Sequence, residues 1–270
     1  MILVAGRPFS GASIAGSYSP DSVEAMVLKA MRDSGYQYKF ESNQALSFEL
    51  RLRAEIVNAA RQLHKSGLGF AVFARTRCSD KYWNRENNGG FRLKRDAVPA
   101  AAIRDIYSNG RAYATECATA MMIVYYKAFL ELYGDAKFNS LFDEIYLMNW
   151  HTTDPLLRAV STPKPVAEIL LGDRGYFANP DVDPQTPQWQ GENVIVMPDN
   201  LYYGHGVGIQ TSERIISSLN RNRKRGAARS AYMMSSAGRP DFNKLAQHDT
   251  AAVREPAQTW RIPERVMQGG

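Results

Sequence analysis

Residues 114–126 read ATECATAMMIVYY, in which small residues around Cys117 lead into an apolar run. Apolar residues continue to Tyr133, so we expect a long buried helix from about Thr115 to Tyr133, with Gly134 as its stop. Cys117 lies at the start of this helix, where free N–H groups and the helix dipole favour negative charge. A thiol there ionises more readily and becomes a nucleophile. Two interpretations of Cys117 stay open, namely chemistry and simple packing as a small apolar residue.

Further helix patterns surround this stretch, and most strand patterns follow it. Caps and helical spacing predict helices over about 19–34, 42–66, 99–109 and 211–222. Apolar runs and turn residues predict strands over 70–74, 145–150, 193–197 and 201–205, and a hairpin over 82–94. The prediction is therefore a single domain of the segregated α+β class, with helices first and strands later. Periodicity fades near the C-terminus, which predicts a folded domain over 1–240 and a flexible tail over 241–270.

The composition is that of an ordinary globular protein with a basic surface. The 270 residues have a formal net charge of +6 and only two cysteines, Cys78 and Cys117. So few cysteines argue against a disulfide-rich secreted scaffold, and we expect no signal peptide and no membrane span. The basic run at 221–226 fits the solvated last turn of a helix better than a nucleic-acid patch. We therefore predict neither a nucleic-acid nor a membrane partner, and no oligomeric state is predicted.

A catalytic cysteine needs a base, and four residues are candidates for it. His205 is flanked by glycines, which leave its imidazole room. Glu192 precedes a buried strand, where desolvation would raise the pKa of its carboxyl toward the working range. Glu116 adjoins Cys117, but consecutive residues of a helix do not face each other, so Glu116 could help only outside regular helix. His151 is the fourth candidate. His205 and Glu192 each also have an ordinary structural interpretation, and both interpretations stay open.

The sequence lacks the usual metal and cofactor signatures. The cysteines and histidines have no zinc-ligand spacing, and neither a calcium-type loop nor a phosphate-binding glycine loop occurs. The sequence therefore predicts no metal and no cofactor.

Several of these segments together resemble one family, the bacterial spore-coat transglutaminases of the Bacillus type, which are calcium-independent protein-glutamine gamma-glutamyltransferases. The resemblance runs in order through about residues 1–239. It is carried by the segments FELRLR (48–53), LHKSG (63–67), AIRDI (102–106), ECATA (116–120), KFN (137–139), NP (179–180), DPQ (183–185), WQGENVI (189–195), GHGVGI (204–209), GAA (226–228) and SAY (230–232).

The resemblance implies a catalytic domain over 1–240, with helices packed on a mainly antiparallel sheet and a core like that of the NlpC/P60 papain-like cysteine hydrolases. It implies that Cys117 is the nucleophile and that Glu192 is its partner. Glu116 is implied as a partial substitute for Glu192, and His205 as a residue near the site.

The resemblance further implies an active-site tunnel with aromatic walls, for which Trp150 and Trp189 are the best candidates, with Phe70 behind them. The expected reaction joins a protein glutamine side chain to a lysine amine through a Cys117 thioester, with release of ammonia and without metal or cofactor. Such a tunnel would keep water from the thioester.

The expected partners are proteins that carry exposed Gln and Lys, by resemblance those of the spore coat. The expected location is the spore coat, after synthesis in the mother-cell cytoplasm. Two rival functions remain at this point. One is a papain-like peptidase or amidase that uses Cys117 and His205, and the other is a basic structural coat protein with a buried Cys117.

Overall fold

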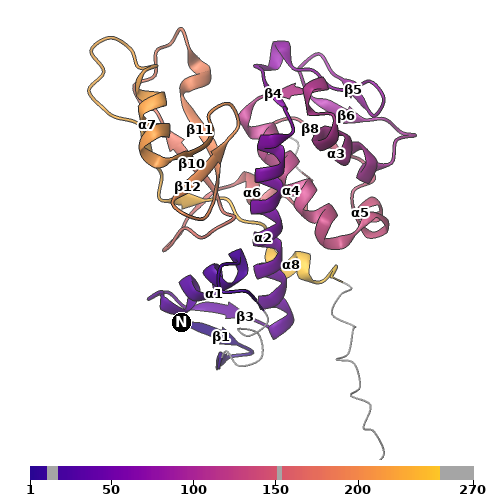
Figure 1. Cartoon of the computed structure of the whole chain (residues 1–270), viewed down its shortest axis with the longest axis vertical. Helices are drawn as coiled ribbons and strands as arrows, with labels where there is room; N and C mark the ends of the chain where they lie inside the picture. Colours follow the sequence, from indigo (N-terminus) through magenta and orange to yellow (C-terminus); the bar gives the residue numbers. More distant parts are fainter. Residues whose placement is uncertain (11–17, 151–153, 250–270) are drawn as a thin grey trace, which may run out of the picture.

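The computed structural model describes residues 1–10, 18–150 and 154–249 (Figure 1). Its helices are α1 (Val23–Asp33), α2 (Asn43–Lys65), α3 (Pro99–Ser108), α4 (Cys117–Tyr133), α5 (Asp135–Leu141), α6 (Arg158–Ser161), α7 (Ser212–Asn220) and α8 (Phe242–Ala246). Its strands are β1 (Ile2–Val4), β2 (Arg7–Pro8), β3 (Tyr38–Phe40), β4 (Gly69–Phe70), β5 (Trp83–Arg85), β6 (Phe91–Leu93), β7 (Ala114–Thr115), β8 (Tyr146–Leu147), β9 (Lys164–Pro165), β10 (Arg174–Ala178), β11 (Gly191–Val196), β12 (Leu201–Gly204), β13 (Gly208–Thr211), β14 (Tyr232–Met233) and β15 (Ser236–Ala237).

Helix α4 lies at the centre of the fold and packs along α2. Every residue from 118 to 130 is buried, as expected for a helix that is apolar all round. The helix ends at Gly134, whose positive φ of 74° suits glycine. The first residue of α4 is Cys117, so the core helix itself sets the position of the thiol.

The main sheet has the antiparallel order β13-β12-β11-β10-β14 and lies beside α2 (Figure 1). All six residues of β11 are buried, because both faces of this strand are covered. Ile195 and Tyr203 join the core of α2 and α4, whereas Phe177 and Val194 pack with Ile215 of α7 on the other face. Strand β11 thereby crosses beside α4 and brings its first residues toward the start of that helix.

Smaller sheets complete the fold on either side of this centre. Strands β2-β1-β3 form one of them near one end of α2, with α1 beside it, and β5-β6-β8 lie with α3 near the other end (Figure 1). The parallel pair of β4 and β7 leads the chain directly into Cys117. The fold is a mixed α/β domain.

The helices predicted from the sequence and the hairpin of β5 and β6 are confirmed, although Ser22 rather than Ser19 caps α1. The segregated order is wrong at the N-terminus, where β1 pairs in parallel with β3. The strand predicted over 70–74 is wrong beyond Phe70, because 73–75 form a 3₁₀ turn and the apolar side chains of this run are exposed. The strand predicted over 145–150 is limited to β8.

The predicted boundary at residue 240 also needs correction within the described residues. Helix α8 lies beyond it and packs against α2, and Tyr133 donates a hydrogen bond of 2.8 Å to the Leu245 carbonyl. Arg51 forms an ion pair with Asp249. Residues 241–249 therefore belong to the fold, and the remainder of the predicted tail lies outside the described residues. Among the helices that the structure describes, none is long and apolar enough to cross a membrane.

Candidate active site

The N-terminus of α4 is built by Glu116, which takes the N-cap position in an extended conformation. One carboxylate oxygen accepts from the Ala118 N–H at 2.6 Å, and the other accepts from the Thr119 N–H at 2.7 Å and the Thr119 hydroxyl at 2.5 Å. The same hydroxyl accepts from the Asn149 N–H at 2.8 Å. The predicted helix start at Thr115 therefore moves to Cys117, and the Glu116 carboxylate is engaged in capping.

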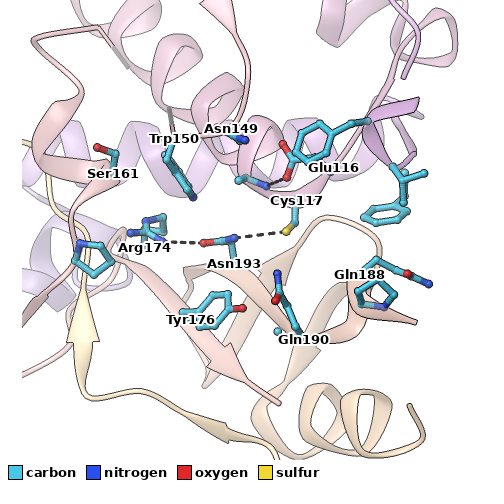
Figure 2. Close-up of a pocket in the computed structure, with 17 residues that line it drawn as sticks. Glu116, Cys117, Asn149, Trp150, Ser161, Arg174, Tyr176, Gln188, Gln190 and Asn193 are labelled. Atoms are coloured by element: carbon cyan, nitrogen blue, oxygen red, sulfur yellow. Dashed lines mark hydrogen bonds between the residues drawn. The ribbon is translucent and has the colours of Figure 1, made fainter. Parts of the chain in front are cut away.

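A cavity of about 640 Å³ opens at this helix start (Figure 2). Cys117, Glu116 and Ala118 line it from α4, and Arg174, Tyr176 and Asn193 line it from the main sheet. Phe70, Val72, Phe73 and Trp150 contribute to its apolar wall. The cavity thus exposes a thiol between a helix N-terminus and a sheet, beside aromatic surface.

Asn193 is the residue that contacts the thiol directly. Its side-chain N–H group donates to Cys117 Sγ at 3.4 Å, and its side-chain oxygen accepts from Arg174 Nη1 at 2.7 Å (Figure 2). The Arg174 guanidinium is buried, donates from Nε to the Val160 carbonyl at 3.0 Å and lies 4.5 Å from the Trp150 ring centroid. The interaction with Arg174 fixes which end of the Asn193 amide faces the sulfur.

The thiol is harder to ionise than the sequence predicts. Burial raises the pKa of Cys117 to about 12, and the negative charges of Glu192 and Glu116 act in the same direction. Hydrogen bonds from Asn193 lower the pKa and partly offset this effect. The expectation of a thiol activated by the helix start alone is therefore corrected, because two carboxylates share the site with it.

Glu192 is buried in β11, does not line the cavity, and makes no hydrogen bond to the sulfur within the described residues. Side chains alternate along a strand, so Glu192 points to the face opposite Asn193, where a methyl group on Gly204 would meet Glu192 Oε1 at 2.8 Å. Burial, followed by the charge of Glu116, raises the pKa of Glu192 well above that of an ordinary carboxyl. Its Oε1 atom has no hydrogen-bond partner among the described residues.

Both ring nitrogens of His205 are engaged elsewhere. Nε2 lies 3.0 Å from the Gly69 carbonyl oxygen, which can only accept, so Nε2 carries the proton. Nδ1 then accepts from the Tyr203 hydroxyl at 3.4 Å. Burial lowers the pKa of His205 to about 4, so the imidazole is neutral at physiological pH. His205 ties β12 to β4 and makes no hydrogen bond to Cys117 within the described chain.

A family comparison gives this geometry its context. The family model for protein-glutamine gamma-glutamyltransferase matches residues 1–249. The chain belongs to this family. It is 42% identical over 246 residues to the protein-glutamine gamma-glutamyltransferase of Bacillus subtilis (strain 168), which covers 91% of this chain and 98% of the relative. It is 40% identical over 234 residues to that of Halalkalibacterium halodurans, which covers 86% of this chain and 80% of the relative.

A solved structure agrees with this family assignment. The transglutaminase from Geobacillus stearothermophilus (without C-terminal extension) aligns with a TM-score of 0.72 at 45% identity, covering 77% of this chain and 98% of that chain. The chain is therefore an acyltransferase that acts on protein glutamine.

Within this transglutaminase fold, the aromatic residues predicted as tunnel walls separate into two groups. Trp150 and Phe70 line the cavity, whereas Trp189 packs against the apolar cluster under α7 and does not line it. Sequence reasoning missed Asn193 and Tyr176, which also face the cavity. Both residues lie in strands near Cys117, but whether their side chains face the cavity depends on the register of β10 and β11.

The remaining base candidate and the expected absence of a metal site complete the description. His151 lies outside the described residues. Within the described ranges, no group of three or more His, Cys, Asp or Glu side chains is placed to hold a metal ion.

Proposed function

We propose that Cys117 is the nucleophile of the family's acyl transfer, and its exposure to the cavity at the start of α4 is the observation that carries this proposal. The thiolate attacks the side-chain carbonyl carbon of a protein glutamine, forming a C–S bond. The C–N bond then breaks, the leaving nitrogen takes a proton, and ammonia departs from a thioester. Backbone N–H groups near the helix start stabilise the oxyanion.

Glu192 is proposed as the acid and base of both half-reactions. It takes the thiol proton and passes it to the leaving nitrogen. It then removes a proton from the attacking lysine amine and returns it to the sulfur as the C–S bond breaks. Its raised pKa and its charge interaction with Cys117 support this role. Because Glu192 makes no direct hydrogen bond to the sulfur, we propose that the proton passes between them through one water molecule.

The cavity walls are proposed to protect the thioester from hydrolysis. Phe70 and Trp150 offer apolar surface beside Cys117, which accommodates the aliphatic stems of glutamine and lysine and lowers the local water content. Phe70, Val72 and Phe73 are also exposed, which extends this apolar surface toward an approaching protein substrate.

The rival peptidase function would use His205 as the base for Cys117. That role requires a free nitrogen near the sulfur and a pKa near neutrality. His205 instead has both nitrogens engaged and a pKa of about 4. The structure therefore gives no support to the cysteine–histidine alternative.

The superfamily, the calcium independence, the substrates and the location of the enzyme are also proposed from the family resemblance. We propose that the domain is related to the NlpC/P60 papain-like hydrolases, and a cysteine at a helix start beside an antiparallel sheet supports this. Calcium independence is proposed because each chemical step is assigned to a group of the chain itself. Spore-coat proteins with exposed Gln and Lys are the proposed substrates, which would place the enzyme in the spore coat.

The decisive experiment compares wild type with Cys117→Ala, using a mixture of proteins that bear Gln and Lys. Wild type should release ammonia and form γ-glutamyl-lysine isopeptides, and Cys117→Ala should do neither. Cys78→Ala is the matched control and should keep full activity, because Cys78 does not line the cavity. Release of new amino termini, or of glutamate without high-mass products, would instead identify a peptidase or amidase.

A further inference from the structure

We propose that the Asn193 side-chain amide, held in orientation by the Arg174 guanidinium, is the side-chain hydrogen-bond donor that stabilises the Cys117 thiolate. Asn193 is a catalytic residue in this proposal because it touches the reacting sulfur, and Arg174 is a positioning residue that acts through it. The inference rests on the proposed role of Cys117, and it assigns the thiolate a partner distinct from the acid–base group.

Arg174, Asn193 and Cys117 are linked in series by two hydrogen bonds. Register pairs Tyr176 with Asn193, so Arg174 lies diagonally beside Asn193 on the same face of the sheet. Arg174 Nη1 donates to Asn193 Oδ1 at 2.7 Å, and Asn193 Nδ2 donates to Cys117 Sγ at 3.4 Å (Figure 2). A guanidinium has no acceptor, so it rejects the flipped amide, in which the oxygen would face the sulfur.

Arg174 is itself held from several directions. Its Nε donates to the Val160 carbonyl at 3.0 Å, and its guanidinium lies over the Trp150 ring. A side chain on Gly238 would meet Arg174 Nε at 2.7 Å, so glycine is required beside it. Arg174 and Asn193 are both almost completely buried, with 3% and 6% of their surface exposed. An Asn193 amide held by this buried guanidinium costs little reorganisation when negative charge develops on the sulfur.

The surroundings explain why the sulfur needs such a donor. Glu116 lies at the helix cap and Glu192 lies in β11, and both negative charges oppose ionisation of the sulfur. Tyr176 and Arg174 are the titratable groups on β10 whose charges interact with it. Arg174 is therefore the cation on that strand. It donates a hydrogen bond to the Asn193 amide, and the amide in turn donates to the sulfur.

The test measures the rate at which iodoacetamide alkylates Cys117, from pH 6 to pH 11, by mass spectrometry of the peptide that contains it. This range lies below the pKa of about 12, so the rate at each pH is proportional to the thiolate fraction, and a change in the midpoint is read from the ratio of variant to wild-type rates at the same pH. This readout reports thiolate formation and does not depend on acyl transfer, so it separates this inference from the proposed function. Asn193→Ala should raise the midpoint of the profile by at least one pH unit, which slows alkylation at least about tenfold below both midpoints. An unchanged midpoint would overturn the role of Asn193.

The role of Arg174 is tested by a double-mutant cycle. Because the charge of Arg174 also interacts with Cys117, Arg174→Met should raise the midpoint in both backgrounds, but by clearly more in the wild-type background than in the Asn193→Ala background. Equal shifts in the two backgrounds would mean that Arg174 acts on the sulfur by charge alone, which would overturn its positioning role. Arg174→Lys keeps the charge but not the planar fork, and it should give a smaller shift than Arg174→Met.

Two further variants guard against misfolding. Asn193→Asp has the same shape and retains an acceptor for Arg174 but loses the donor, so it should raise the midpoint at least as far as Asn193→Ala. If its midpoint equals that of wild type, the donor is refuted whatever the Arg174 variants do. Asn179→Asp makes the same change at another buried amide, whose donors serve the Trp189 and Leu219 carbonyls. It should lower stability and leave the alkylation profile of the folded protein unchanged.

Discussion

Replacing Glu116 with glutamine separates the capping role of its carboxylate from its electrostatic effect on Cys117. The carboxylate accepts from the Ala118 and Thr119 N–H groups and from the Thr119 hydroxyl, which in turn accepts from the Asn149 N–H. Glutamine keeps one oxygen for Thr119, but its NH₂ group stands where Ala118 needs an acceptor. The helix start and the loop that carries Trp150 should both loosen.

The magnitudes follow from these contacts. Loss of one hydrogen bond to a charged group, together with the favourable charge at a helix N-terminus, costs about 2 kcal/mol. For a domain of this size the melting temperature should fall by roughly 4–8 °C. Removal of the negative charge should at the same time lower the pKa of the Cys117 thiol by about 0.5 unit, which raises the thiolate population about threefold at neutral pH.

Thermal unfolding and pH-dependent alkylation of Cys117 check the two effects separately. The matched control is Ser22→Ala, which removes the cap of α1 and should cost about 1 kcal/mol without changing the alkylation of Cys117. If Glu116→Gln leaves both the melting temperature and the alkylation profile unchanged, the capping argument fails. If it slows acyl transfer while alkylation stays at the wild-type rate, Glu116 is a base and not only a cap.

The remaining predictions concern pH, the buried ion pairs, the aromatic residues and calcium. Because the pKa of His205 is lowered to about 4 from an unfolded value near 6.5, its contribution to stability is fully present above pH 6.5 and is lost toward pH 4 at about 1.4 kcal/mol per pH unit. Urea denaturation of His205→Gln should show a flatter dependence over that interval, and an unchanged slope would contradict the assignment. Asp173→Asn removes one of the two acidic partners of buried Arg53 and the acidic partner of Arg239, and it should cost about 3–5 kcal/mol in urea denaturation. Asp33→Asn at an exposed pair should change nothing measurable. Trp150→Ala should raise the ratio of glutamate to isopeptide product, whereas Trp189→Ala, outside the cavity, should leave it unchanged; equal effects would refute the division between them. Treatment with EDTA should leave acyl transfer at its original rate, and a loss restored by Ca²⁺ would show a calcium requirement.

The helices could be predicted because their signals are local. Ser42 caps α2, Pro99 opens α3 and Thr211 precedes α7, and each of these residues acts within one turn of its own helix. The short strands could not be predicted in the same way. The pairing of β1 with β3 joins Ile2 to Tyr38. A strand of three residues is too short for a hydrophobic alternation that would predict such a distant partner.

The candidate site shows the same division between local and distant information. Cys117 could be selected from the start of its helix, and Glu192 from its place before a buried strand. The contact between Asn193 and Cys117 joins residues 76 positions apart, and it depends on which face of β11 each side chain takes. A shift of one residue in register would exchange the faces of Glu192 and Asn193.

Hydrophobic alternation does not set that register, because β11 is buried on both faces and its apolar residues suit either one. Two glycines favour the observed register instead. A methyl group on Gly191 would meet the Tyr176 hydroxyl at 2.2 Å, and one on Gly204 would meet Glu192 Cγ and Oε1 at 2.8 Å. Both close approaches exist only in the observed pairing, so a shifted strand would place larger residues against Tyr176 and Glu192. The choice between an amide and a carboxylate beside the thiol therefore rests on glycines that carry no chemistry of their own.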